Sequence, residues 1–144
     1  MKRIITTDKA PKAIGPYSQA IEANGVLYIS GQLALDPATG KLVDGGITEQ
    51  TQQVLKNIGE ILNAAGYDFT TVVKSTVLLE DMNYFKEMNE EYGKIYSVNP
   101  PARAARQNQS RPYCAFPQNG RSRHGRSWRR LLWPSQSRVG SCGS

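Results

Sequence analysis

The sequence predicts a single α+β domain, and three kinds of local pattern lead to this prediction. Short strand-like runs come first, one near residues 3–5 and two more at 17–22 and 26–30. The last two are joined through Asn24-Gly25, and Asn-Gly between apolar-rich runs is a strong signal for a tight β-hairpin. Apolar residues at helical spacing and a run of β-branched residues follow. The order strand, strand, strand, helix, strand, helix predicts a sheet with both helices packed on one face.

The first helix is predicted between Thr48 and Gly66. Thr48 is a suitable N-cap residue, Glu49 suits the first turn, and Gly66 suits the left-handed conformation that ends many helices. The apolar residues recur at helical spacing and are Val54, Leu55, Ile58, Ile61, Leu62 and Ala65. This spacing predicts one buried helix face.

The segment Phe69–Leu79 is rich in Val and Thr, which favours a strand in the interior of a sheet. Asp81 then suits the N-terminus of a second helix, which Asn99-Pro100-Pro101 would end. The apolar stripe of that helix consists of Phe85, Met88, Tyr92 and Ile95. Arg103-Ala104-Ala105 resembles the beginning of a further strand, and one or two strands after Pro101 would complete the sheet.

The distribution of charge divides the chain into two parts. With 144 residues, we expect one domain, and residues 1–105 carry 10 Lys and Arg against 12 Asp and Glu, a net charge of −2. Residues 106–144 carry 8 Arg and no acidic residue, a net charge of +8. Three interpretations of this tail remain open: an arm that binds nucleic acid, a solvated tail without function, and translation out of frame. We favour the last, because Arg, Ser, Trp and Cys abruptly replace Lys, Glu and Val.

Several classes of protein are not supported. Cys114 and Cys142 form no CxxC pair and His124 is the single histidine, so the sequence predicts neither a zinc site nor a disulfide framework. P-loop, GxGxxG, HExxH and GxSxG motifs do not occur, and we expect no cofactor. No targeting signal or membrane-spanning run occurs either, which predicts a cytoplasmic protein without a membrane partner. An enzyme of this kind would act on a substrate that is already reactive.

Seven short motifs occur in the order and spacing of one family. They are 10–20, 29–32, 36–40, Gln50-Thr51 with Asn57-Ile58, 64–66, 74–77 and 101–103. Over residues 1 to about 105 the chain therefore resembles the Rid, or YjgF-like, family of reactive-intermediate (imine/enamine) deaminases. The resemblance implies a chorismate-mutase-like α+β fold, a homotrimer with ligand clefts between subunits, and hydrolysis of 2-iminopropanoate- or 2-iminobutanoate-type imines to 2-keto acids and ammonia.

The resemblance also implies roles for five residues. Arg103 would bind the substrate carboxylate through its planar guanidinium, and Tyr17 would place a hydroxyl near the imine as the second catalytic residue. Ser30 and Gly31 would let the backbone approach the substrate, and Asn89 matches a pocket-lining Asn of some members. Each residue also has a plainer interpretation. Arg103 could be a surface residue that pairs with a neighbouring acid, and Tyr17 could fill the hairpin core. Ser30 and Gly31 could simply end a strand, and Asn89 could be an exposed helix residue.

The sequence departs from the family after Arg103. Members continue with Leu-Pro-Lys and then a Val-Glu-Ile-Glu-like strand, one Glu of which helps to activate water. Here no acidic residue follows Glu91, so that acid/base group is missing, and Ala105 stands where many members carry Cys. Two alternatives to the deaminase therefore stay open: a regulatory trimer that binds small carboxylates without chemistry, and an RNA-binding or endoribonuclease-like translation inhibitor. Nucleic acid is not our expected partner, because only the tail is basic.

Overall fold

The computed structural model describes residues 1–108, and the strands within them form two groups. An antiparallel sheet has the order β1-β2-β3, and β4 and β5 form a separate parallel pair. The strands are β1 (Lys2–Ile5), β2 (Ala20–Ala23), β3 (Val26–Ile29), β4 (Lys74–Leu79) and β5 (Ala102–Gln107). All five predicted strand positions contain a strand, but the second begins at Ala20 rather than Tyr17. The predictions for residues 109–144 lie outside the described residues.

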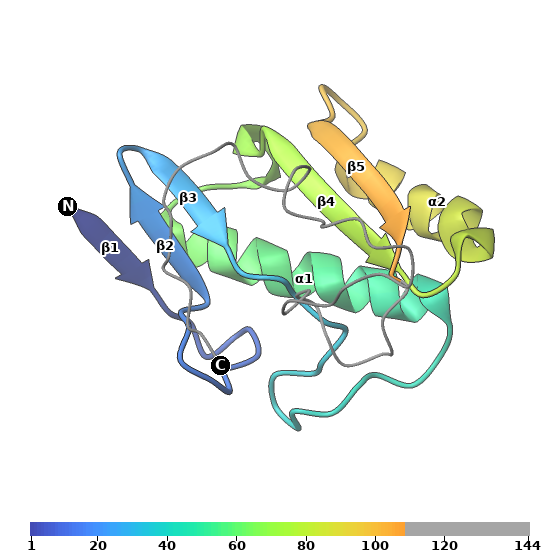
Figure 1. Cartoon of the computed structure of the whole chain (residues 1–144), viewed down its shortest axis with the longest axis horizontal. Helices are drawn as coiled ribbons and strands as arrows, with labels where there is room; N and C mark the ends of the chain where they lie inside the picture. The colour runs from blue at the N-terminus through green and yellow to red at the C-terminus, as the bar shows by residue number, and fades with distance from the viewer. Residues whose placement is uncertain (109–144) are drawn as a thin grey trace, which may run out of the picture.

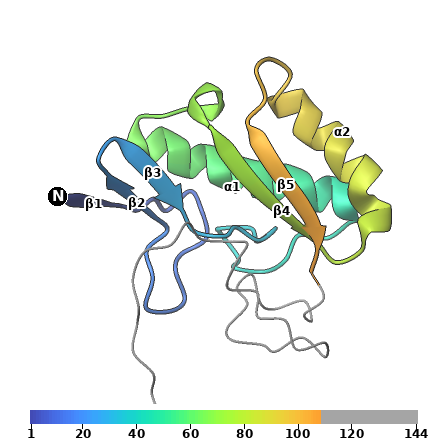
Figure 2. The same ribbon diagram turned by 45° about the horizontal axis from the view of Figure 1, so that its top comes forward.

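Two helices, α1 (Ile47–Ala65) and α2 (Phe85–Ile95), cover one side of the strands. Figures 1 and 2 show α1 running behind both groups of strands and α2 beside β5 on the same side. The predicted α+β arrangement, with both helices on one face, is confirmed. Neither helix in this part of the chain combines the length and the apolar character needed to cross a membrane.

The predicted hairpin is confirmed at the level of single dihedral angles. Asn24 and Gly25 have φ values of 52° and 73°, and the strands pair in register from Ala23 opposite Val26. Two consecutive positive φ values are the requirement of the type I′ turn, which Asn-Gly meets at little cost. The turn chemistry therefore sets the register of β2 and β3.

The predicted beginning of α1 is wrong by two residues. Its N-cap is Gly46 rather than Thr48, and the Glu49 carboxylate accepts a hydrogen bond of 2.8 Å from the Gly46 backbone N–H. The carboxylate satisfies the N–H of the cap residue itself, whereas glycine has no side chain that could accept from the N–H groups of the first turn. The predicted end is correct, because Gly66 has a φ of 87° and donates to the Asn63 carbonyl.

The single strand predicted over Phe69–Leu79 is also wrong in its first half. Phe69–Thr71 forms a 3₁₀ turn, η1, and only Lys74–Leu79 is extended. The Asp68 carboxylate accepts from the Thr70 N–H at 2.8 Å and from its hydroxyl at 2.5 Å, bonds that also lower the pKa of Asp68. These local bonds outweigh the strand preference of the threonines. In the same way Asp81 caps a 3₁₀ turn, η2 (Met82–Tyr84), and α2 begins after it.

Two clusters of buried residues form the core, and α1 contributes to both. The first contains Ile5, Ala10, Ala20, Ile61 and Ala65, and the second contains Leu55, Leu79, Met88, Tyr92 and Tyr96. Ile95, a predicted member of the α2 stripe, is 42% exposed. Tyr96 is buried instead, because the helix ends at Ile95 and the next ring folds back onto Tyr92 and Phe69.

Candidate functional site

Arg103 lies at the beginning of β5, and its side chain points toward α2. It pairs in register with Ser75 of β4. Its guanidinium carbon lies 4.5 Å from the centre of the Tyr92 ring and 5.5 Å from that of Phe85. The cavity beside it has a volume of about 360 Å³ and is lined by Asn89, Tyr92, Gly93, Tyr96, Pro100, Pro101 and Arg103. The end of α2, the proline turn and β5 together form this cavity.

The guanidinium N–H groups of Arg103 have no protein acceptor within residues 1–108. Arg3 provides the contrast, since it donates through Nε to the Glu22 carboxylate at 2.7 Å. Cation–π contacts with the Tyr92 and Phe85 rings engage the Arg103 guanidinium without using its N–H edge as a hydrogen-bond donor. That edge is the part that binds a carboxylate through two parallel bonds.

Asn89 lines the same cavity as Arg103. It is exposed on α2, and both residues lie within reach of a small molecule bound there. Tyr96, which directly follows the last residue of α2, is buried, and this burial raises its pKa to about 12. The Tyr96 hydroxyl therefore stays protonated at neutral pH. The structure brings two of the five predicted site residues to one place.

The other three predicted residues lie together at the end of β3, in the antiparallel region. The Ser30 N–H donates to the Gln19 carbonyl at 2.9 Å, and its hydroxyl donates to the Ser18 carbonyl at 2.6 Å. These bonds hold Ser30 and Gly31 beside the segment that carries Tyr17. The Tyr17 side chain is 50% exposed, so it does not fill the hairpin core. The cavity at Arg103 contains none of these three residues.

Two buried amides organise the loops around this second group, and the sequence reasoning did not identify them. Gln19, 3% exposed, donates to the Pro11 carbonyl at 2.8 Å and accepts from the Thr7 N–H at 2.7 Å. Asn57, fully buried, donates to the carbonyls of Leu33 and Leu35 at 3.1 and 2.9 Å. The available signal was that Asn57 falls on the apolar stripe of α1, where a polar residue needs buried partners.

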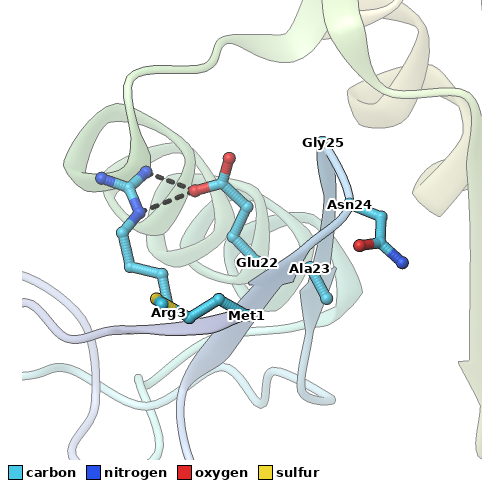
Figure 3. A pocket seen from close by; sticks show the side chains of 6 residues that line it. All are labelled: Met1, Arg3, Glu22, Ala23, Asn24 and Gly25. Carbon is cyan, nitrogen blue, oxygen red and sulfur yellow. Dashed lines mark hydrogen bonds and ion pairs between the residues drawn. The ribbon is translucent and has the colours of Figure 1, made fainter.

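A larger hollow of about 500 Å³ lies at the other end of the molecule (Figure 3) and contains no predicted site residue. It is lined by Met1, Arg3, Glu22, Ala23, Asn24 and Gly25. Figure 3 shows the Arg3 guanidinium facing the Glu22 carboxylate, which also accepts from the Tyr67 hydroxyl at 3.0 Å. The bonds from Arg3 and Tyr67 lower the pKa of Glu22, and the bond to Glu22 raises that of Tyr67. Because these groups satisfy one another, we place the candidate site at Arg103.

No group of three or more His, Cys, Asp or Glu side chains within residues 1–108 is arranged to hold a metal ion. Glu91, which precedes Tyr92 in the sequence, is buried and already engaged. It accepts from Lys94 at 2.5 Å and from Gln52 at 2.9 Å, and both bonds lower its pKa. Glu91 thus ties α2 to α1 rather than facing a ligand.

Comparison with known proteins places this small α+β domain in a family. The family described as Endoribonuclease L-PSP matches residues 7–112. The chain belongs to this family, the Rid or YjgF-like family that its motifs resemble.

Individual relatives agree with this assignment. The human 2-iminobutanoate/2-iminopropanoate deaminase is 57% identical over 107 residues, which are 74% of this chain and 78% of the relative. A structure of a putative endoribonuclease from Thermotoga maritima is 47% identical with a TM-score of 0.73, covering 75% of this chain and 85% of that one. The structure of E. coli TdcF with bound serine is 32% identical with a TM-score of 0.71, covering 77% and 89%.

Proposed function

We propose that this protein hydrolyses 2-imino acids and their enamines, of the 2-iminobutanoate and 2-iminopropanoate type, to 2-keto acids and ammonia. One observation carries the proposal: a guanidinium held over the Tyr92 ring, without a protein acceptor in the described residues, borders a cavity of about 360 Å³. The name of the human relative gives the same substrates. A bound 2-imino acid would present its carboxylate to Arg103, with Asn89 beside it.

The chemistry requires orientation more than activation. The carboxylate, once bound to both nitrogens of the Arg103 edge, fixes the position of the adjacent imine carbon. Water adds to that carbon to give a carbinolamine, and transfer of a proton to nitrogen lets ammonia leave as the C=O bond forms. Tyr17 is the proposed hydroxyl near the imine nitrogen. The acidic residue that members carry in their last strand has no counterpart here, because no acid follows Glu91.

The proposed assembly is a homotrimer in which a cleft between subunits joins the two groups of site residues. Tyr17, Ser30 and Gly31 of one subunit would face Arg103 and Asn89 of another. The uncovered side of the antiparallel sheet supports this assembly, since Ile4, Ile21 and Tyr28 form an apolar row across its three strands. Ile4 and Tyr28 are 59% and 61% exposed, and such a row is suited to burial against a second copy. The proposed compartment is the cytoplasm.

The test compares Arg103→Ala with Arg106→Ala, a neighbouring Arg whose side chain alternates to the other side of β5. We expect Arg103→Ala to weaken binding of 2-ketobutyrate and to slow imine hydrolysis on the order of 100-fold or more, since two charge-assisted bonds are lost. Arg106→Ala should leave both within about twofold. Isothermal titration and ammonia release under imine-generating conditions measure the two effects.

Two results would count against the proposal in different ways. Unchanged turnover in Arg103→Ala would refute the role of Arg103 as the carboxylate anchor. Binding of 2-ketobutyrate by the parent without any imine turnover would instead identify a regulatory carboxylate-binding protein. The described part does not favour the RNA alternative, because residues 1–105 carry a net charge of −2 and nucleic-acid binding needs positive charge.

A further inference from the structure

We propose that Tyr92, held in place by Ser75, is a positioning residue that fixes the Arg103 guanidinium for carboxylate binding. The inference rests on the proposed function, because it concerns how that carboxylate is recognised. Tyr92 is 7% exposed, lies on α2 and forms the wall of the cavity next to Arg103. Its ring supports the guanidinium from one side.

The geometry links three elements in a closed set of contacts. The strand pairing places Ser75 of β4 next to Arg103 of β5. The Ser75 and Tyr92 hydroxyl oxygens are hydrogen-bonded at 2.7 Å, and the Arg103 guanidinium lies 4.5 Å from the centre of the Tyr92 ring. The ring is therefore held at its hydroxyl end by β4 and contacted on its face by β5.

This arrangement answers the main difficulty of recognition by arginine. A free arginine side chain samples many rotamers, and ordering it costs conformational free energy. A guanidinium attracted to an aromatic face loses that freedom before the ligand arrives, while its in-plane N–H groups remain available. A tyrosine also supplies the hydroxyl that fixes the ring through Ser75, which a phenylalanine lacks.

Two other rings near Tyr92 have different partners. Tyr96 packs against Tyr92 with ring centres 4.4 Å apart, and Phe69 meets Tyr96 edge to face at 5.5 Å. Phe69 is partly buried against the same cluster but is not among the rings that contact Arg103. It therefore supplies a matched control, since its loss weakens the core without removing the support of the guanidinium.

The experiment measures dissociation constants by calorimetry for 2-ketobutyrate and for its neutral amide, 2-oxobutanamide. For Tyr92→Leu we expect 2-ketobutyrate to bind about 5- to 30-fold more weakly, the range of a desolvated cation–π contact. For Tyr92→Phe and Ser75→Ala we expect about 2- to 5-fold, the value of one neutral hydrogen bond. The dissociation constant of the amide should be the same in all three variants as in the parent, because the amide lacks the charge that Arg103 recognises.

Two controls separate positioning from stability. Phe69→Leu should lower the thermal midpoint as Tyr92→Leu does but leave 2-ketobutyrate binding within about twofold. Tyr67→Phe removes a hydroxyl bonded to Glu22 and should leave binding unchanged. A partial return of affinity in Tyr92→Trp, with an aromatic face but no hydroxyl, would support the platform role.

The outcomes are distinguishable. If the parent binds 2-ketobutyrate and Tyr92→Leu binds it as tightly as Phe69→Leu does, the positioning role is overturned while the carboxylate site stands. Equal weakening of acid and amide by Tyr92→Leu would also overturn it, because the effect would then be general damage to the cavity. If the parent binds no 2-keto acid, the proposed function itself fails and the inference fails with it.

Discussion

The two regions of this molecule position site residues by different physical means. In the antiparallel region, around β1–β3 and the second half of α1, the core is formed by small and aliphatic side chains, and buried amides hold the loops through backbone carbonyls. In the parallel region, around β4, β5 and α2, the core includes the rings of Tyr92 and Tyr96, and the Tyr92 ring supports Arg103. Hydrogen bonds to backbone carbonyls hold the segment of Tyr17 and Ser30, whereas a cation–π contact orients the arginine.

The regions also differ in how their edges are completed. Figures 1 and 2 show β3 and β4 as the edges of the two groups that lie toward each other. Within residues 1–108 each pairs with a strand on one side alone, and α1 is the element that both regions share. Unpaired edges of this kind expose backbone groups and reduce the surface that the helix covers.

The largest expected effect follows from replacing residues 109–144 by a family-like ending with Leu-Pro-Lys and Val-Glu-Ile-Glu. A strand added at such an edge buries four or five aliphatic residues, worth about 6 to 15 kcal/mol in total. We expect the replacement to raise the thermal midpoint, the trimer content and imine hydrolysis. Equal melting and equal turnover for the two chains would show that the present tail folds and functions, and that the out-of-frame interpretation is wrong.

A smaller effect is expected at the amide that supports the antiparallel region. Asn57→Ala leaves the Leu33 and Leu35 carbonyls without their donor, which should lower the free energy of unfolding by about 2 to 5 kcal/mol. Urea denaturation measures this change. Asn63→Ala, at an exposed position of the same helix, should cost no more than about 0.5 kcal/mol. Similar losses in both variants would contradict a specific role for the buried amide.

The smallest effect is on the stability of the protein at acidic pH. Each region contributes one carboxylate with a lowered pKa. Bonds from Arg3 and Tyr67 lower the pKa of Glu22, and bonds from Lys94 and Gln52 lower that of Glu91, both from an ordinary value of 4.5. A lowered pKa in the folded state stabilises the protein above pH 4.5, and this contribution is lost as the pH falls through the folded value. We expect thermal midpoints of Glu22→Gln and Glu91→Gln to depend less on pH below 4.5 than those of the parent. An unchanged slope in either variant would refute the contribution of that residue.

Local signals explain which parts of the fold were predictable. The hairpin and the end of α1 followed from Asn24-Gly25 and Gly66, because positive φ is decided within a few residues. The strand predicted over Phe69–Leu79 was wrong in its first half, because one Asp68 carboxylate outweighs the preference of several β-branched residues. No pattern in a single segment could reveal this competition.

The candidate site shows the same limit at longer range. The family resemblance indicated Arg103 and Asn89. That both line one cavity depends on the parallel pairing of β4 with β5 and on the position of α2, which connects the two strands in the sequence. Tyr92 was predicted as a member of a buried stripe, and nothing in its spacing indicated a contact with Arg103. Contacts between distant segments decide the geometry of the site. Such contacts could not be predicted from the local patterns of the sequence.

The Asn24-Gly25 turn has a consequence for the order in which the protein is built. A two-residue hairpin closes in about 1 to 10 μs, whereas synthesis proceeds at about 5 to 20 residues per second. Arg103 is 78 positions after Gly25, so it is added roughly 4 to 16 s after the turn. Once Ser30 has been added, the growing chain carries the Tyr17 and Ser30 segment but not the arginine, until Arg103 is reached. During translation, affinity for a carboxylate is therefore gained late, after the first sheet has had ample time to pair.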